Sequence, residues 1–163
     1  MEIFHTIIQE NSLPLLSILR KHMADSKMKY AIICIDDDPM ILQMLNFQIR
    51  KRFDMECALL EFFTNPKEAI EEIETLLIER IDIIFLIVDY QMPEINGGEL
   101  IRIVKNKFEN LKFIMLSGQA NSTSVNDLLE SNLLDKFISK PWSEDTLVSA
   151  IKPLLDQFNI SEI

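Results

Sequence analysis

Short apolar runs alternate with segments of helical periodicity from residue 29 almost to the C-terminus. The runs Tyr30 to Ile35 and Ile83 to Val88 are apolar without alternation, which predicts strands buried on both faces. Pro39 to Phe53 instead has apolar residues four positions apart, as in an amphipathic helix. Extended along the chain, this pattern predicts strands at 30–35, 56–62, 83–88, 112–116 and 136–139 and helices at 39–53, 66–77, 99–108, 123–133 and 144–158.

This regular alternation of strand and helix also predicts the topology. Successive parallel strands are joined by right-handed helical crossovers, and strands without a polar face need helices on both sides of the sheet. The sequence therefore predicts an α/β fold, a doubly wound five-stranded parallel sheet of the flavodoxin-like (βα)5 kind with strand order 2-1-3-4-5. In this order the first and third strands are neighbours.

The predicted domain covers residues 29–158 and leaves a segment on either side. Residues 1–28 hold two amphipathic stretches broken near Pro14, which predict an N-terminal helical extension. We expect this extension to pack on the domain or on a second copy of the chain, which would give a homodimer. Residues 159–163 are expected to form a C-terminal tail, and Pro153 should kink or shorten the last helix because proline lacks a backbone donor.

Polar side chains stand where four of the predicted strands end. Carboxylates follow the first and third strands, a hydroxyl group the fourth and an ammonium group the fifth. These residues are Asp36, Asp37, Asp89, Ser117 and Lys140. Because the carboxyl ends of parallel strands meet at one edge, we expect these groups to converge where the first and third strands lie side by side.

Three neighbouring carboxylates repel one another unless a proton or a divalent cation relieves the repulsion. An oxygen-only set of ligands suits Mg²⁺, or Mn²⁺ in its place. We predict Asp37 and Asp89 as direct ligands, Asp36 as a ligand through water, and the backbone carbonyl of Gln91 as a third protein ligand.

The same groups suit phosphoryl transfer, which depends mostly on positioning and charge neutralisation. Asp89 is the candidate nucleophile and would form an acyl phosphate. Lys140 could pair with one phosphoryl oxygen, and the hydroxyl group of Ser117 could donate to another.

In this combination the chain resembles the receiver domain of two-component response regulators. The resemblance covers about residues 29 to 158 and rests on the acidic pair, the run from Val88 to Pro93, Gly97-Gly98, Leu116-Ser117-Gly118 and Lys140-Pro141. It implies phosphoryl transfer to Asp89 from a phosphohistidine of a sensor histidine kinase or phosphotransfer protein. Such a domain catalyses only its own phosphorylation and dephosphorylation, so the chain is not expected to be an enzyme acting on a separate substrate.

The resemblance also implies a switch. Ser117 and Phe137 occupy the positions of the switch hydroxyl and of the aromatic residue that follows it inward, with Phe137 replacing the commoner tyrosine. Their movement would remodel the surface formed by the fourth helix, fifth strand and fifth helix, where a downstream protein target would bind. Gln91, two residues after the phosphoacceptor, is expected to affect the lifetime of the phosphoryl group.

Two alternatives remain open from the sequence. A haloacid dehalogenase-like phosphatase would use Asp36 as nucleophile and Asp38 as general acid and base, but it gives Asp89 no role, and Met40 stands where that motif usually has threonine or valine. The second alternative is an interaction scaffold that has lost phosphorylation. Asp38 is also expected to cap the helix that begins at Pro39.

Composition further narrows the classes of protein to which this chain could belong. Hydrophobic residues make up 48% of the 163 positions, enough for one domain with a core, and a formal net charge of −10 argues against direct nucleic-acid binding. Cys34 and Cys57 fall in predicted strands without metal-ligand spacing, so both are interpreted as small buried hydrophobic residues. With neither a signal-peptide pattern nor the ~20 apolar residues of a membrane span, a cytoplasmic protein is expected. Because the given sequence ends shortly after the last predicted helix, we also expect a stand-alone regulator or phosphorelay intermediate.

Overall fold

One parallel sheet has the strand order β2-β1-β3-β4-β5, which confirms the predicted topology. The computed structural model describes residues 29–118 and 123–163, so the expected extension at 1–28, and a dimer through it, lie outside the described residues. The strands are β1 (Tyr30–Ile35), β2 (Ala58–Phe63), β3 (Asp82–Asp89), β4 (Phe113–Ser117) and β5 (Lys136–Ser139).

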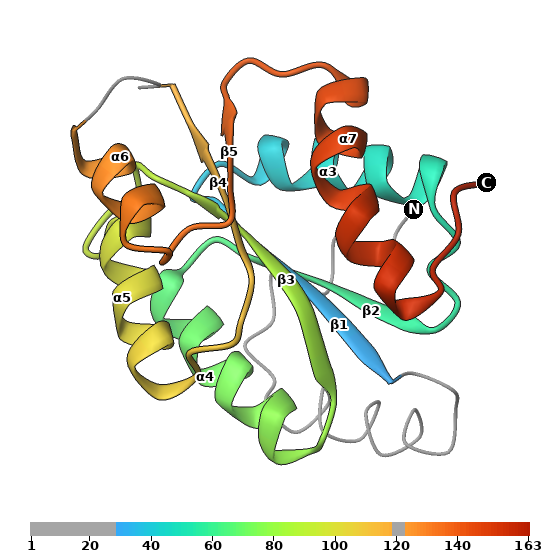
Figure 1. The fold of residues 1–163 in the computed structure, drawn as a ribbon, viewed down its shortest axis with the longest axis horizontal. Helices are drawn as coiled ribbons and strands as arrows, with labels where there is room; N and C mark the ends of the chain where they lie inside the picture. The colour runs from blue at the N-terminus through green and yellow to red at the C-terminus, as the bar shows by residue number, and fades with distance from the viewer. Residues whose placement is uncertain (1–28, 119–122) are drawn as a thin grey trace.

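Helices cover both faces of this sheet (Figure 1). They are α3 (Pro39–Arg52), α4 (Pro66–Ile78), α5 (Gly97–Lys107), α6 (Thr123–Glu130) and α7 (Glu144–Leu155), which continues into the 3₁₀ turn η1 (Asp156–Phe158). Helices α3 and α7 lie on one face, and α4, α5 and α6 lie on the other. The regular part of α7 ends two residues after Pro153, in agreement with the expected shortening.

Side-chain caps define where several helices begin. Asp38 accepts a hydrogen bond from the backbone nitrogen of Met40 at 2.8 Å, and Asn65, Asn96 and Ser143 cap α4, α5 and α7 in the same way. Pro39 and Pro66 follow two of these caps at the first helical position, where a missing backbone donor costs nothing. All four capping residues thus lie in the loop between the carboxyl end of a strand and the next helix, where the chain turns back over the sheet.

The core consists of two apolar layers separated by the sheet. Ile32 and Phe85 contact the layer under α3 and α7, whereas Ile33 and Leu86 contact the layer under α4, α5 and α6. All four side chains are fully buried. Burial on both faces explains why the strand sequences lack polar alternation.

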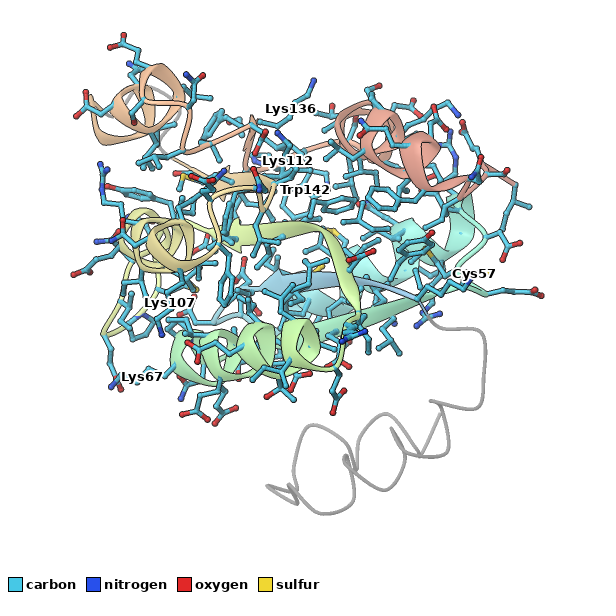
Figure 2. The ribbon with its side chains drawn as sticks, turned by 60° about the horizontal axis from the view of Figure 1, so that its bottom comes forward. Cys57, Lys67, Lys107, Lys112, Lys136 and Trp142 are labelled. Atoms are coloured by element: carbon cyan, nitrogen blue, oxygen red, sulfur yellow. The ribbon has the colours of Figure 1, made fainter. Side chains whose placement is uncertain are left out.

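The start of β2 and the C-terminal segment differ in detail from expectation. Strand β2 begins at Ala58, so Cys57 precedes it and is exposed (Figure 2); its predicted burial is wrong, while Cys34 is buried. Residues 159–163 do not extend away from the domain: Glu162 forms an antiparallel bridge with Phe53, and Ile160 is 4% exposed.

Within the described ranges, no helix combines the length and apolar character that crossing a bilayer requires.

Candidate functional site at the carboxyl edge of the sheet

Three of the five polar residues at the strand ends are buried, although charged and hydroxyl groups usually remain in water. Asp36 is 1% exposed, Asp89 3% and Ser117 1%, and among the described residues these three form the buried polar group of the domain. Such burial is unfavourable without partners, so the contacts of these groups decide what the site can do.

Strand register brings the three residues to one edge. Ile35 pairs with Val88 and therefore places Asp36 next to Asp89. On the other side of β3, Asp89 pairs with Leu116, and Ser117 pairs with Ser139 of β5. Lys140 follows directly, and its backbone nitrogen donates to the carbonyl oxygen of Ser117 at 2.8 Å.

The Lys140 side chain joins the two buried carboxylates. Its Nζ lies 2.6 Å from Asp36 Oδ2 and 2.6 Å from Asp89 Oδ1. The second oxygen of Asp36, Oδ1, accepts the backbone N–H of Asp38 at 2.9 Å. Both oxygens of Asp36 therefore have partners within the protein, and one ammonium group partly neutralises two carboxylates.

Burial and pairing shift the titration of these groups. Burial raises the pKa of Asp36 above its usual 3.8, against the opposing effect of the hydrogen bonds from Lys140 and the Asp38 backbone. Burial also disfavours the charged form of Lys140, but hydrogen bonds to Asp36 and Asp89 outweigh it and raise the pKa of Lys140 above 10.5. The lysine is therefore a fixed positive charge at neutral pH.

Asp37 adds a third carboxylate to this group. One oxygen from each of Asp36, Asp37 and Asp89 lies within 4.8 Å of the others, and Asp37 itself is exposed. A cluster of oxygen ligands with one exposed member suits a hard divalent cation that keeps part of its water shell. The structure thus brings together three of the predicted metal ligands, and Gln91 lies exposed in the loop after β3.

The two predicted switch residues lie on neighbouring strands. Ser117 ends β4, and Phe137 lies on β5 opposite Met115. The Phe137 ring is half-buried and packs against the apolar layer under α4, α5 and α6. It therefore has one side toward the core and one toward solvent.

Gly97 has a structural role that its motif alone does not explain. Its backbone nitrogen donates to the carbonyl oxygen of Tyr90 at 3.0 Å. A Cβ atom at this position would lie 2.3 Å from the carbonyl oxygen of Asp89, so a larger residue would displace the backbone that carries the carboxylate. The sequence signal was the pair Gly97-Gly98, but only the fold shows which contact requires the first glycine.

Asp38 lies outside this cluster of carboxylates. Its carboxylate is exposed and caps α3 through the Met40 backbone nitrogen, as predicted. The phosphatase alternative needs Asp38 as general acid and base and gives Asp89 no role. In the structure, however, Asp89 is buried and its carboxylate contacts the Lys140 ammonium group.

Comparison with known proteins identifies the family. Residues 32–152 match the family described as the response regulator receiver domain. The chain is similar to the transcriptional regulatory protein FlgR of Helicobacter pylori (28% identical over 124 residues, 76% of this chain and 29% of FlgR). It is also similar to a chemotaxis protein CheY homolog of Campylobacter jejuni (30% over 82 residues, 49% of this chain and 62% of the homolog). The chain thus spans less than two thirds of the length of either relative.

Solved structures agree at the level of the fold. An uncharacterized protein from Neptuniibacter caesariensis superposes with a TM-score of 0.67 at 21% identity, covering 80% of this chain and 90% of that one. The CheY-containing complex with CheX, BeF3 and magnesium from Borrelia burgdorferi gives 0.66 at 17% identity, covering 81% and 93%. Since the family match extends over most of the described domain, the chain belongs to the receiver domain family of two-component response regulators.

Proposed function

We propose that this chain accepts a phosphoryl group on Asp89 in a cytoplasmic phosphorelay, with a phosphohistidine of a sensor histidine kinase or phosphotransfer protein as donor. The observation that carries the proposal is the position of Asp89, which is buried, contacts the Lys140 ammonium group and belongs to the cluster with Asp36 and Asp37. A nucleophile, a fixed cation and a cluster suited to a divalent ion are the parts that phosphoryl transfer requires.

In the proposed step, an oxygen of the Asp89 carboxylate forms a bond to phosphorus while the bond from phosphorus to the histidine nitrogen breaks. The nitrogen leaves with the bonding electron pair. Lys140 then pairs with a phosphoryl oxygen, and the hydroxyl group of Ser117 donates to another. These contacts offset the charge that the phosphoryl group brings to a site already holding three carboxylates.

The oxygen-only donor set fits Mg²⁺, or Mn²⁺. Asp37 and Asp89 would hold the ion directly, together with the Gln91 carbonyl. Asp36 would act through water, which is supported by the engagement of both its oxygens with Lys140 and the Asp38 backbone. When bound, Mg²⁺ supplies positive charge next to the phosphoryl oxygens.

The surface around the site supports a helical donor. Met40 and Phe47 are 68% and 64% exposed, and a spacing of seven residues places them on one side of α3. Helix α3 begins right after the acidic cluster, so an apolar helix face docked there would bring its histidine toward Asp89. The two exposed apolar side chains of Met40 and Phe47 suit a protein donor rather than a small metabolite.

Phosphorylation would be read out on the surface of α6, β5 and α7. In the proposed switch, Ser117 moves toward the phosphoryl group and Phe137 changes its burial, which alters the surface offered to a downstream protein. The half-buried state of Phe137 leaves room for such a change. The chain would therefore act as a signalling domain that catalyses only its own phosphorylation and dephosphorylation.

Intact mass spectrometry tests the proposal. The wild type is incubated with Mg²⁺ and a small acyl phosphate or phosphoramidate, beside Asp89→Asn and Asp36→Asn. One phosphoryl adduct that disappears in Asp89→Asn is expected. An adduct that survives in Asp89→Asn but requires Asp36 would favour the phosphatase, and an unmodified wild type without calorimetric heat from Mg²⁺ would favour the inactive scaffold.

A further inference from the structure

Helix α3 contacts the segment after Lys140 at two places beyond the reacting groups, once in the loop at Trp142 and once at Glu144, the first residue of α7. Trp142 Nε1 donates to Gln48 Oε1 at 3.0 Å. Two residues later, the Glu144 carboxylate pairs with Lys51 Nζ at 2.9 Å and with Arg52 Nη1 at 3.1 Å. The helix that begins at the acidic cluster therefore also contacts the segment after the active-site lysine.

These two contacts differ in strength. The ion pairs of Glu144 are solvent-accessible, with Lys51 53% exposed, and exposed pairs contribute only about 0–1 kcal/mol and weaken with salt. Trp142 instead packs its half-buried ring against the apolar layer under α3 and α7, and its hydrogen bond is uncharged. The contact between Trp142 and Gln48 is thus the principal attachment of the loop to α3.

Lys140 needs such an attachment because its own side chain is flexible. Four methylene groups joined by rotatable bonds separate the ammonium group from the backbone. Its Nζ nevertheless lies 2.6 Å from Asp36 Oδ2 and 2.6 Å from Asp89 Oδ1. The backbone N–H of Lys140 is held by Ser117 on the sheet side. Trp142, two residues further along, fixes the other side of the loop.

We infer that Gln48 and Trp142 are positioning residues that hold the Lys140 loop against α3, so that the lysine reaches the phosphoryl oxygens in a productive orientation. This inference rests on the proposed function. Neither residue touches the reacting atoms, so both would act through Lys140. Displacing a positioned group by a fraction of an ångström slows a reaction without removing any member of the site.

The test compares the rate of phosphoryl uptake from a small acyl phosphate at saturating Mg²⁺. Gln48→Met removes the acceptor at similar length, Trp142→Phe keeps an aromatic ring without the donor, and Gln48→Glu retains an acceptor oxygen. Gln43→Met is the matched control, because Gln43 is an exposed glutamine on the same helix. Each variant is also made in a Lys140→Met background, and the dissociation constant for Mg²⁺ is measured by calorimetry.

Loss of one neutral hydrogen bond should lower the rate roughly two- to tenfold in Gln48→Met and Trp142→Phe. Gln48→Glu and Gln43→Met should keep the wild-type rate, and Mg²⁺ affinity should not change. In the Lys140→Met background, the Gln48 and Trp142 substitutions should have no further effect, because residues that act through one group are not additive.

Two results would overturn the inference while the proposed function stands. One is a wild-type rate in Gln48→Met, and the other is an equal fall in both the wild-type and Lys140→Met backgrounds, which would indicate a general structural role. A wild type that takes up no phosphoryl group would defeat the proposed function, and the inference with it.

Discussion

The Lys140 ammonium nitrogen lies 2.6 Å from Asp89 Oδ1, although β4 separates β3, which ends at Asp89, from β5, which Lys140 directly follows. The lysine reaches across the end of β4, where Ser117 is buried, and contacts Asp36 on the far side as well. One side chain thus links the ends of β5, β3 and β1. This arrangement makes Lys140 the positive charge nearest to the proposed phosphoacceptor among the described residues.

Replacing Lys140 by methionine should slow phosphorylation of Asp89 roughly ten- to a hundredfold, since hydrogen bonds to charged groups contribute about 1.5–3 kcal/mol. The rate is measured by intact mass spectrometry with a small acyl phosphate. Lys136→Met is the control, because Lys136 is exposed at the opposite end of β5 (Figure 2). Equal rates in the two variants would show that Lys140 takes no part in the reaction.

Asp37→Asn should weaken Mg²⁺ binding at least tenfold, because it removes a charged oxygen from the cluster. Asp38→Asn makes the same chemical change one residue later and should leave the affinity unchanged, since asparagine caps a helix as well as aspartate does. Isothermal titration calorimetry compares the two. If both variants bind as the wild type does, Asp37 is not a ligand.

Burial raises the pKa of Asp36, which predicts a pH-dependent stability. The folded protein holds this proton more tightly than the unfolded chain, so folding takes up a proton between pH 3.8 and the raised pKa. The stability contributed by Asp36 should therefore fall as pH rises through this window. Urea unfolding of the wild type and Asp36→Asn, without Mg²⁺, measures the difference; a difference that grows in favour of the wild type with rising pH would contradict the prediction.

Gly97→Ala should destabilise the domain by about 1–3 kcal/mol, because its Cβ would lie 2.3 Å from the Asp89 carbonyl oxygen and the backbone would have to move. Gly98→Ala should change stability less, since the nearest atoms to its Cβ lie 3.3 Å away at the ends of the Asn96 and Leu128 side chains. Denaturant unfolding of the two variants tests the contact, and a larger loss in Gly98→Ala would refute it.

Residues 159–163 should contribute to folding rather than form a free tail. Ile160 is 4% exposed within the layer under α3 and α7, so Ile160→Ala should cost about 2 kcal/mol or more. Ile163 is 81% exposed, and Ile163→Ala should stay within about 0.5 kcal/mol of the wild type. Thermal unfolding distinguishes the variants, and similar midpoints for both would mean that the domain ends before residue 160.

Most residues of the site could be predicted from the sequence because they directly follow or end the strands. A buried strand shows its length in its apolar run, and parallel strands deliver their carboxyl ends to one edge, so Asp36, Asp89, Ser117 and Lys140 could be selected before the structure was known. The same reasoning failed for Cys57, because the start of β2 depends on its pairing with β1 rather than on the apolar run. Gln48 carries no sequence signal, since a polar residue on an amphipathic helix is ordinary.

By itself, the sequence determined the order of strands and helices, the burial of the sheet and the edge at which the polar groups gather. These features follow from local periodicity and from the handedness of crossover connections. Only the tertiary structure decided that Lys140 bridges Asp36 and Asp89, that Trp142 contacts Gln48, and that Ile160 returns to the core. Those contacts depend on strand register, helix packing and side-chain rotamers, which bring together residues far apart in the chain and leave no periodic trace in it.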